Sequence, residues 1–429
     1  MADTTFADLP VAARADVAVF GGGPAGICAA TAAAEEGADV VLVERYGFLG
    51  GMATAGLVNP FMTYRREHVQ VNAGLFERIL QALSAKGGRS DTENGRAFDP
   101  DIMKIVADDL TTGAGVRLMF HAFVVDAVAD GDRVIQGIVA DKSGLRAVEA
   151  DVFVDCTGDG DLAARVGAEF EKGRSEDGLC QPMTTYFRMA NVDRDRMPPQ
   201  DEINERYRAA KAAGEIDNPR DDVHRAIPST RTGEVVYNTT RVLNHDSTDA
   251  DSLSEAELIG RRQVEQMVAF LKTLPGFENA DLVRIAPQIG VRESRRIMGD
   301  YVLRGDDVTT AAKFDDAVAH GCFSIDIHNP TGTGILGERV PEGDWYDIPY
   351  RCLYARGMEN LLMAARPISA DFRAHGSVRC MPISGLYKEL MITARVLAQG
   401  FYGWRDGSRL RLSFYGGESA RLAPELNAG

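Results

Sequence analysis

A glycine-rich turn close to the N-terminus constrains the fold of this chain more than any other feature of the sequence. It lies between an uninterrupted apolar run at 16–20 and an alanine-rich segment at 24–37 that ends at a glycine, and a second apolar run follows at 39–43. This order predicts a buried strand, a helix and another buried strand. Because the crossover between the strands is short and helical, the two strands are predicted to be parallel.

The turn has the spacing GxGxxG, and each of its three glycines has a separate reason to be glycine. The turn comprises Gly21, Gly22, Gly23, Pro24, Ala25 and Gly26. Gly21 permits the tight passage from strand to helix, Gly23 lets the backbone approach a pyrophosphate, and Gly26 allows the helix to pack closely on the strand. The helix N-terminus adds free N–H groups and a positive dipole end. The segment therefore predicts a dinucleotide-binding site.

An acidic residue follows at the position where the ribose of a bound dinucleotide is expected. Glu44 ends the second strand, 18 residues after Gly26. A carboxylate there accepts hydrogen bonds from a free ribose 2′-OH and repels a 2′-phosphate, which disfavours NADP. FAD and NAD both remain open on this motif alone.

The net charge and the cysteine spacing indicate which partners and which cellular compartment are expected for this protein. Lys+Arg total 47 and Asp+Glu 63, and the net charge of −16 argues against nucleic acid as a partner. The N-terminus lacks a secretory signal, and glycines and a proline interrupt the uncharged stretch 17–34, so no membrane span is expected. The six cysteines are scattered without a CxxC pair, which predicts a cytoplasmic protein with reduced thiols and no metal site.

The remaining pattern predicts two lobes. Further strands are expected at 116–125, 134–140, 151–155 and 360–364, and helices at 253–274, capped by Ser252 or Ser254, and at 384–399. The middle of the chain is more charged and contains prolines. We therefore predict an α/β fold in which a parallel-sheet nucleotide-binding lobe, residues 1–165 and 353–429, is interrupted by a second lobe at 166–352.

Four stretches together resemble a known family. They are DVAVFGGGPAGICAATAAAEEGADVVLVER at 16–45, FLGGMATAGLV at 48–58, DCTGDGDLAARVGA at 155–168 and NLLMAARPISADFRAHGSVRCMP at 360–382. The chain resembles the FAD-dependent oxidoreductases of the glutathione-reductase-type fold, in the branch that contains the flavin subunit of heterodisulfide reductase and uncharacterised bacterial enzymes. The resemblance implies a Rossmann-like FAD-binding domain, an inserted α+β substrate domain, and non-covalent FAD as the cofactor.

The resemblance also places the FAD contacts on particular residues. They are Gly21, Gly23, Pro24, Ala25, Gly26, Glu44, Arg45, Gly50, Gly51, Met52, Val124, Thr157, Gly158, Asp159, Arg366 and Ser377. Gly50 and Gly51 would let a loop pass close to the ribityl chain, and Arg366 would stabilise negative charge on the flavin. The chain departs from the family pattern at 385–390, GLYKEL, where relatives have a helix rich in glycine and alanine. Larger side chains there would hinder the last flavin contact.

His328 is the candidate acid/base, because the ordinary pKa of histidine lies near neutrality. Asp326 precedes it by two residues, so on a strand both side chains would face the same side and the carboxylate could orient the ring. Arg292 and Arg295, three residues apart, would share a face of a helix and bind a substrate carboxylate, or else form internal salt bridges.

His375 and Arg379 are the second candidate pair, on a loop expected to close over the flavin. Together these residues favour an enzyme that transfers a hydride between FAD and a small organic substrate oriented by arginines. Three alternatives stay open: a flavin monooxygenase, a flavin-carrying electron-transfer subunit, and a nucleotide-binding relative without catalysis. A homo-oligomer is compatible with the sequence, which specifies neither the substrate nor the electron acceptor.

Overall fold

A seven-stranded sheet lies at the centre of the computed structural model, which describes residues 9–67, 69–89, 96–225 and 230–384. The strands follow the order β5 (Arg117–Met119), β2 (Val40–Val43), β1 (Val11–Phe20), β8 (Gly144–Asp155), β7 (Arg133–Asp141) and β6 (Phe123–Asp130), and β18 (Leu361–Met363) also pairs with β8. The pairs among β5, β2, β1, β8 and β18 are parallel, whereas β6, β7 and β8 form an antiparallel meander. The fold is therefore α/β with a parallel core.

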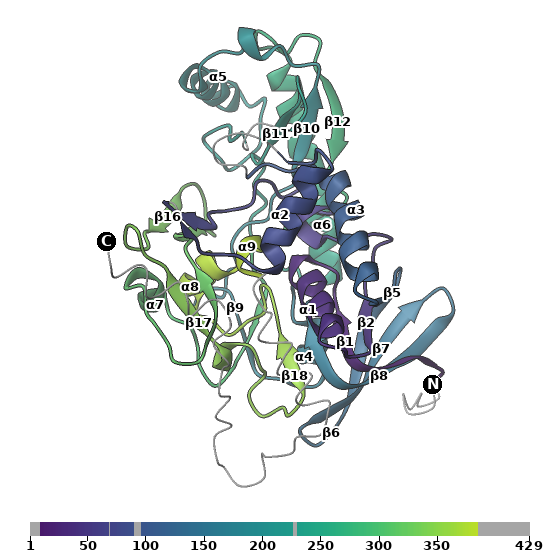
Figure 1. Cartoon of the computed structure of the whole chain (residues 1–429). Coiled ribbons are helices and arrows are strands. Elements are labelled where there is room, and N and C mark those ends of the chain that lie inside the picture. The colour runs from purple at the N-terminus through teal and green to yellow at the C-terminus, as the bar shows by residue number, and fades with distance from the viewer. Residues whose placement is uncertain (1–8, 68, 90–95, 226–229, 385–429) are drawn as a thin grey trace.

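The predicted strand–helix–strand unit is confirmed. β1 and β2 pair in parallel, with Val17 opposite Val40 and Phe20 opposite Val43, and α1 (Pro24–Glu35) connects them. Figure 1 shows α1 side by side with α2 (Leu75–Ala85) and α3 (Pro100–Gly113) next to the sheet. The apolar runs of both strands are buried as expected for a sheet that helices cover.

The expected single strand at 116–125 is wrong. The chain forms β5, turns at His121 with a left-handed φ of 55°, and only then enters β6. β5 joins the parallel side of the sheet beside β2, while β6 joins the antiparallel meander beside β7. The apolar run continues across the break, so its periodicity contains no signal for two strands with different neighbours.

A smaller lobe has a hydrophobic core of its own. Its sheet consists of β10 (Phe187–Ala190), β11 (Val235–Tyr237) and β12 (Asp281–Ile285), and its helices are α5 (Gln200–Ala212) and α6 (Ala250–Leu271). Figure 1 shows this sheet and α5 at the top, away from the large sheet. The helix expected at 253–274 is present as α6, but its cap is Asp249, whose side chain accepts from the Ser252 N–H.

The segments after this lobe pack against the main core. They are β13 (Arg295–Ile297), α7 (Gly305–Thr309), β14 (Ala317–Gly321), β15 (Ile325–His328), β17 (Tyr346–Pro349), α8 (Phe372–Val378) and α9 (Met381–Ser384), while β16 (Ile335–Glu338) pairs with β15 and is exposed. Ile297, Ile327 and Ile348 belong to the same apolar cluster as β1 and β2. The separately packed core spans Phe187 to Ala280, inside the predicted second lobe. The domain boundaries at 165 and 352 remain a prediction.

The described chain also contains shorter elements, and the C-terminal segment differs from the sequence prediction. The short elements are β3 (Arg65–Arg66), β4 (Val69–Gln70), α4 (Asp161–Arg165) and β9 (Phe170–Lys172). The expected loop around 371–379 is instead α8, which Asp371 caps by accepting from the Ala374 N–H. The predicted helix at 384–399 and the altered segment 385–390 lie outside the described residues. Within the described ranges, none of the helices has the length and apolar character that crossing a bilayer requires.

Candidate active site

The glycine turn forms a backbone cradle between β1 and α1. Gly21 has a φ of 101°, and a Cβ there would lie 2.3 Å from the carbonyl oxygen of Cys156. A Cβ at Gly26 would lie 1.9 Å from the carbonyl oxygen of Gly21. These two glycines are therefore required by the turn and by helix packing, as predicted from the spacing.

Gly23 is glycine for a different reason. A Cβ built on it would meet only the Cα of Gly51, at 3.9 Å, so the protein itself leaves the space above Gly23 open. Its φ of −68° suits any residue, and no side chain caps α1 at this position. The uncapped N-terminus of α1 faces that open space and can bind an anion there.

Glu44 is buried at the end of β2 and holds the turn from the opposite side. Its carboxylate accepts from the backbone N–H groups of Gly22 at 2.6 Å and Tyr46 at 2.9 Å. Burial raises the pKa of Glu44, and the N–H groups of Tyr46 and Gly22 oppose that increase. Each oxygen thus retains acceptor capacity for a ribose hydroxyl.

The end of β8 forms the neighbouring wall. Asp155 is fully buried and accepts from the N–H and hydroxyl of Thr157, at 3.0 and 2.7 Å, so it shapes the loop rather than facing solvent. Gly158 has a φ of 84°, and a Cβ there would reach within 2.7 Å of the Arg366 guanidinium. Arg366 forms an ion pair with Asp159 at 3.0 Å. The third and fourth resemblance stretches, at 155–168 and 360–382, therefore meet at this wall.

One cavity of about 1210 Å³, part of it open to solvent, joins these features. The predicted cofactor residues in its lining are Gly21, Gly23, Pro24, Ala25, Glu44, Arg45, Gly51, Met52, Thr157, Gly158 and Arg366. Val124 lies in an adjoining hollow together with Glu44 and Thr157. The open space over Gly23, the uncapped helix end and the buried acid at Glu44 fit a cofactor that carries a pyrophosphate and a ribose, as FAD does.

The same cavity is also lined by two arginines and the half-buried carboxylate of Asp326. Arg292 donates through Nη1 to the carbonyl of Pro182 at 2.6 Å and to Thr184 Oγ1 at 2.7 Å. Arg379 donates through Nη2 to Asp326, to its carbonyl at 3.0 Å and its carboxylate at 3.3 Å. Burial, followed by the charge of Arg379, lowers the pKa of Arg292 to about 9. Among the described residues, no carboxylate lies within ion-pair distance of Arg292.

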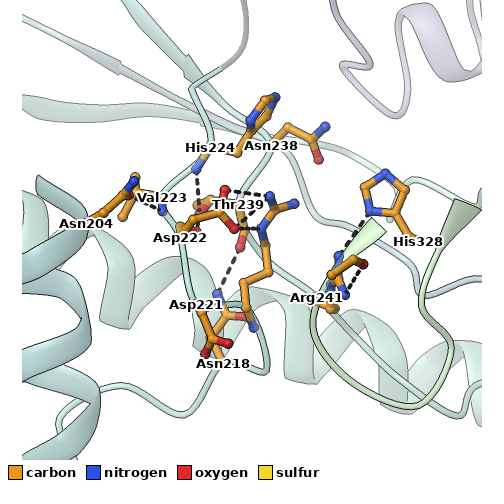
Figure 2. Close-up of polar contacts among 12 residues, drawn as sticks. Asn204, Asn218, Asp221, Asp222, Val223, His224, Asn238, Thr239, Arg241 and His328 are labelled. Carbon is orange, nitrogen blue, oxygen red and sulfur yellow. Dashed lines mark hydrogen bonds and ion pairs between the residues drawn. The ribbon is translucent and has the colours of Figure 1, made fainter. Parts of the chain in front are cut away.

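His328 lies beside these groups on β15. The segment is a strand, and the ring Nε2 is 3.5 Å from Asp326 Oδ2, so the two side chains share a face as expected for a strand. The ring Nδ1 is 3.1 Å from Arg241 Nη2, as Figure 2 shows. Burial, followed by the charge of Arg292, lowers the pKa of His328 to about 3, despite the opposing effect of Asp326. Burial and the neighbouring arginines therefore favour the neutral imidazole, and the acid/base role of His328 stays a prediction.

Several predicted site residues lie elsewhere. Arg295 and Arg292 do not share a helical face, because β13 begins at Arg295, which pairs with Asp161 at 3.0 Å beside the cradle. His375 is fully buried on α8 and is absent from the cavity lining. The hydroxyl of Ser377 lies 2.6 Å from that of Tyr346 and donates to the carbonyl of Phe323.

Three further predicted residues shape the cradle without lining the cavity. Gly26 and Gly50 belong to the turns themselves, and Asp159 holds Arg366. Gly50 has a φ of 109°, which favours glycine at that turn.

Sequence reasoning missed residues that the smaller lobe contributes. Tyr186, just before β10, and Asn238, just after β11, line the same cavity as Arg292 and His328. Arg241 contacts His328 from behind that lining. None of them belongs to a local motif, since their places depend on the pairing of distant segments. The one signal in the sequence was a polar residue, Asn238, directly after an apolar run.

Comparisons with known proteins extend these observations. Thiamine thiazole synthase from Aeropyrum pernix is 31% identical over 198 residues, which cover 42% of this chain and 67% of that protein. A geranylgeranyl bacteriochlorophyll reductase-like protein from Thermoplasma acidophilum is 13% identical, with a TM-score of 0.42 and coverage of 90% of this chain and 78% of its own. L-proline dehydrogenase from P. horikoshii is 11% identical, with a TM-score of 0.44 and coverage of 91% and 95%.

A family model described as FAD dependent oxidoreductase matches residues 16–385. The match includes the glycine cradle, Glu44, Arg292, Arg379 and His328. It covers far more than half of the chain, and the cavity fits the cofactor that the family name states. The chain therefore belongs to the FAD dependent oxidoreductase family, as an oxidoreductase with FAD as its cofactor.

Proposed function

We propose that this protein transfers a hydride between FAD and a small organic acid, whose carboxylate binds Arg292. The observation that supports this most strongly is the continuity of one cavity from the glycine cradle to the arginines. A small molecule at the arginine end would lie in the same space as the flavin end of the cofactor.

The charge of Arg292 favours an anionic substrate. This guanidinium is 8% exposed, and its hydrogen-bond acceptors are a carbonyl, a hydroxyl and the amide of Asn238, all of them neutral. Among the described residues Arg292 forms no ion pair, and a buried unpaired cation carries a desolvation cost that a bound carboxylate would offset. Arginine binds carboxylates through paired donors, which also orients the substrate.

The remaining residues would position the substrate and handle its polar groups. FAD supplies the hydride chemistry when it is bound. Asp326 and His328 line the same end and present a carboxylate and an imidazole N–H to the substrate. Arg379 holds the Asp326 side chain in place. Tyr186 and Asn238 cover this end from the smaller lobe and would exclude water from it.

Finer assignments also belong to this proposal. The glutathione-reductase-type branch and the relation to the heterodisulfide reductase flavin subunit rest on the four motif stretches alone. A cytoplasmic location rests on the scattered cysteines alone. We assign the cap role to the lobe that contains the core from Phe187 to Ala280.

The test is anaerobic incubation of the FAD-loaded protein with each of a panel of small carboxylic acids. Loss of oxidised-flavin absorbance measures reduction of the flavin. NADH and NADPH are tested in the same way as further electron donors. One or more acids should reduce the flavin. Arg292→Met should raise KM for that acid about ten- to a hundredfold, the worth of one charge-assisted pair. His328→Ala should lower turnover and keep flavin content.

Arg261→Met is the matched control, since this arginine is exposed on α6 and pairs with Glu257. It should change neither KM nor turnover. An unchanged KM in Arg292→Met, or reduction only by uncharged substrates, would contradict the proposal.

A further inference from the structure

A second arginine determines which nitrogen of His328 carries the proton. Arg241 Nη2 lies 3.1 Å from His328 Nδ1. A guanidinium has only donors, so Nδ1 must be the acceptor in this hydrogen bond. The neutral ring therefore carries its proton on Nε2, the nitrogen that faces Asp326 and the cavity.

Arg241 is held tightly enough to impose this tautomer. Its backbone N–H donates to the side chain of Gln263 at 2.8 Å, and the amide of Gln263 donates back to the Arg241 carbonyl at 2.9 Å. Its other guanidinium nitrogen, Nη1, donates to the carbonyls of Gly332 and Gly334, in the turn that follows the strand of His328. Arg241 is 2% exposed, so water does not compete for these bonds. Figure 2 shows the side chain directed at the ring of His328.

The charges around His328 also oppose a second proton. Arg241 faces it from the smaller lobe, Arg292 from the segment before β13, and Arg379 from the end of α8. Asp326 on its own strand is the one anion among these neighbours. Protonation would require Nδ1 to give up the Arg241 bond and would place an imidazolium among three guanidinium groups.

We propose that Arg241 is a positioning residue that fixes His328 as a neutral Nε2–H donor, and that His328 binds a substrate oxygen without exchanging a proton. This deepens the proposed function, on which the role of the substrate oxygen rests. It replaces the acid/base role that the sequence predicts for His328. The substrate class becomes an organic acid with a second oxygen, carbonyl or hydroxyl, near its carboxylate.

The tautomer can be tested without any substrate. The FAD-loaded protein is labelled with ¹⁵N at its histidines, and the ring signals that are absent from the spectrum of His328→Gln are those of His328. This ring should be protonated at Nε2 and unprotonated at Nδ1. Its ¹⁵N chemical shifts should not change from pH 5.5 to 8. In Arg241→Met the same ring should begin to titrate within this range, whereas Arg241→Lys should restore a donor to Nδ1 and keep it constant. Titration of His328 in the wild-type protein, or a proton on Nδ1, would overturn the proposal.

Kinetics give a second and separate test. The amide of Gln can donate a hydrogen bond but cannot act as a base, so His328→Gln should retain most of the turnover that His328→Ala loses, on the order of a hundredfold. Arg241→Met should add an ionisation to the pH profile of kcat/KM that the wild-type profile lacks. If both His328 variants are equally inactive and the Arg241→Met profile is unchanged, His328 acts as a base and the proposal is wrong. The NMR result stands even if no acid in the panel reduces the flavin, so failure of the two proposals can be distinguished.

Discussion

Replacing Gly23 by alanine should separate cofactor binding from folding. The new Cβ would meet only the Cα of Gly51, at 3.9 Å, and the backbone at Gly23, with a φ of −68°, accepts alanine. The protein without FAD should therefore unfold as the wild type does. With FAD, however, the methyl group would occupy the open space above the cradle and push the pyrophosphate away from the backbone N–H groups of α1.

The expected magnitude follows from the bonds that would be lost. A hydrogen bond from a backbone N–H to a charged phosphate contributes about 1.5–3 kcal/mol, so loss of one such bond weakens binding about ten- to a hundredfold. Gly26→Ala provides the contrast, because its Cβ would lie 1.9 Å from the carbonyl oxygen of Gly21. That variant should lose about 1–3 kcal/mol of stability even without FAD.

The affinity for FAD is measured by titrating the FAD-free protein with FAD and recording flavin fluorescence. The free energy of unfolding is measured by urea unfolding of each variant without FAD. Gly113→Ala is the control, since a Cβ at this last residue of α3 meets nothing within 4 Å. It should leave both measurements unchanged. Wild-type FAD affinity in Gly23→Ala, or a loss of stability equal to that of Gly26→Ala, would refute the assignment of the cradle.

Further predictions concern three charged side chains. In the substrate-free protein, Arg292→Met should change the free energy of unfolding by no more than about 1 kcal/mol, because relief of the buried charge offsets the acceptors left unpaired; urea unfolding measures this. Glu44→Gln should weaken FAD binding about tenfold in a fluorescence titration, since the amide nitrogen cannot accept from the N–H of Gly22 or Tyr46. Burial, followed by the charge of Asp159, raises the pKa of Asp161 to about 6 from 3.8. The folded state thus retains a proton that the unfolded state releases, so this group lowers stability as the pH rises from about 4 to 6, by at most about 3 kcal/mol. Melting temperatures across that range should fall less steeply with pH in Asp161→Asn than in the wild type.

The cofactor end of the cavity could be predicted from the sequence because its determinants are local. The turn from Gly21 to Gly26 and Glu44 belong to one short strand–helix–strand unit, and the reasons for its glycines are backbone contacts within that unit or with the adjacent strand. Local spacing therefore carries the information. The pair of Asp326 and His328 was predictable for the same reason, since a strand places residues two apart on one face.

The substrate end could not be predicted in the same way. Arg292 and Arg295 have helical spacing, yet neither lies on a helix. Arg292 has no regular secondary structure, and Arg295 begins β13, where it pairs with Lys172 in a two-stranded sheet. The protonation of His328 depends on Arg241, which is 87 residues away in the sequence and belongs to the smaller lobe. Tertiary pairing, which single-residue spacing does not encode, decides both outcomes.

The overall negative charge of the chain and the proposed anionic substrate are compatible, because long-range and local electrostatics differ. A net charge of −16 produces a field that repels small anions at long range, but physiological salt screens such a field beyond about 8 Å. Inside the cavity, the charged residues at the substrate end are Arg292 and Arg379 against Asp326. Charges in a buried site are screened much less, so this local excess governs which ligand is stable there. An acidic surface therefore does not exclude the proposed organic acid as the substrate. Its binding would depend on the Arg292 guanidinium, which forms no ion pair with any described residue.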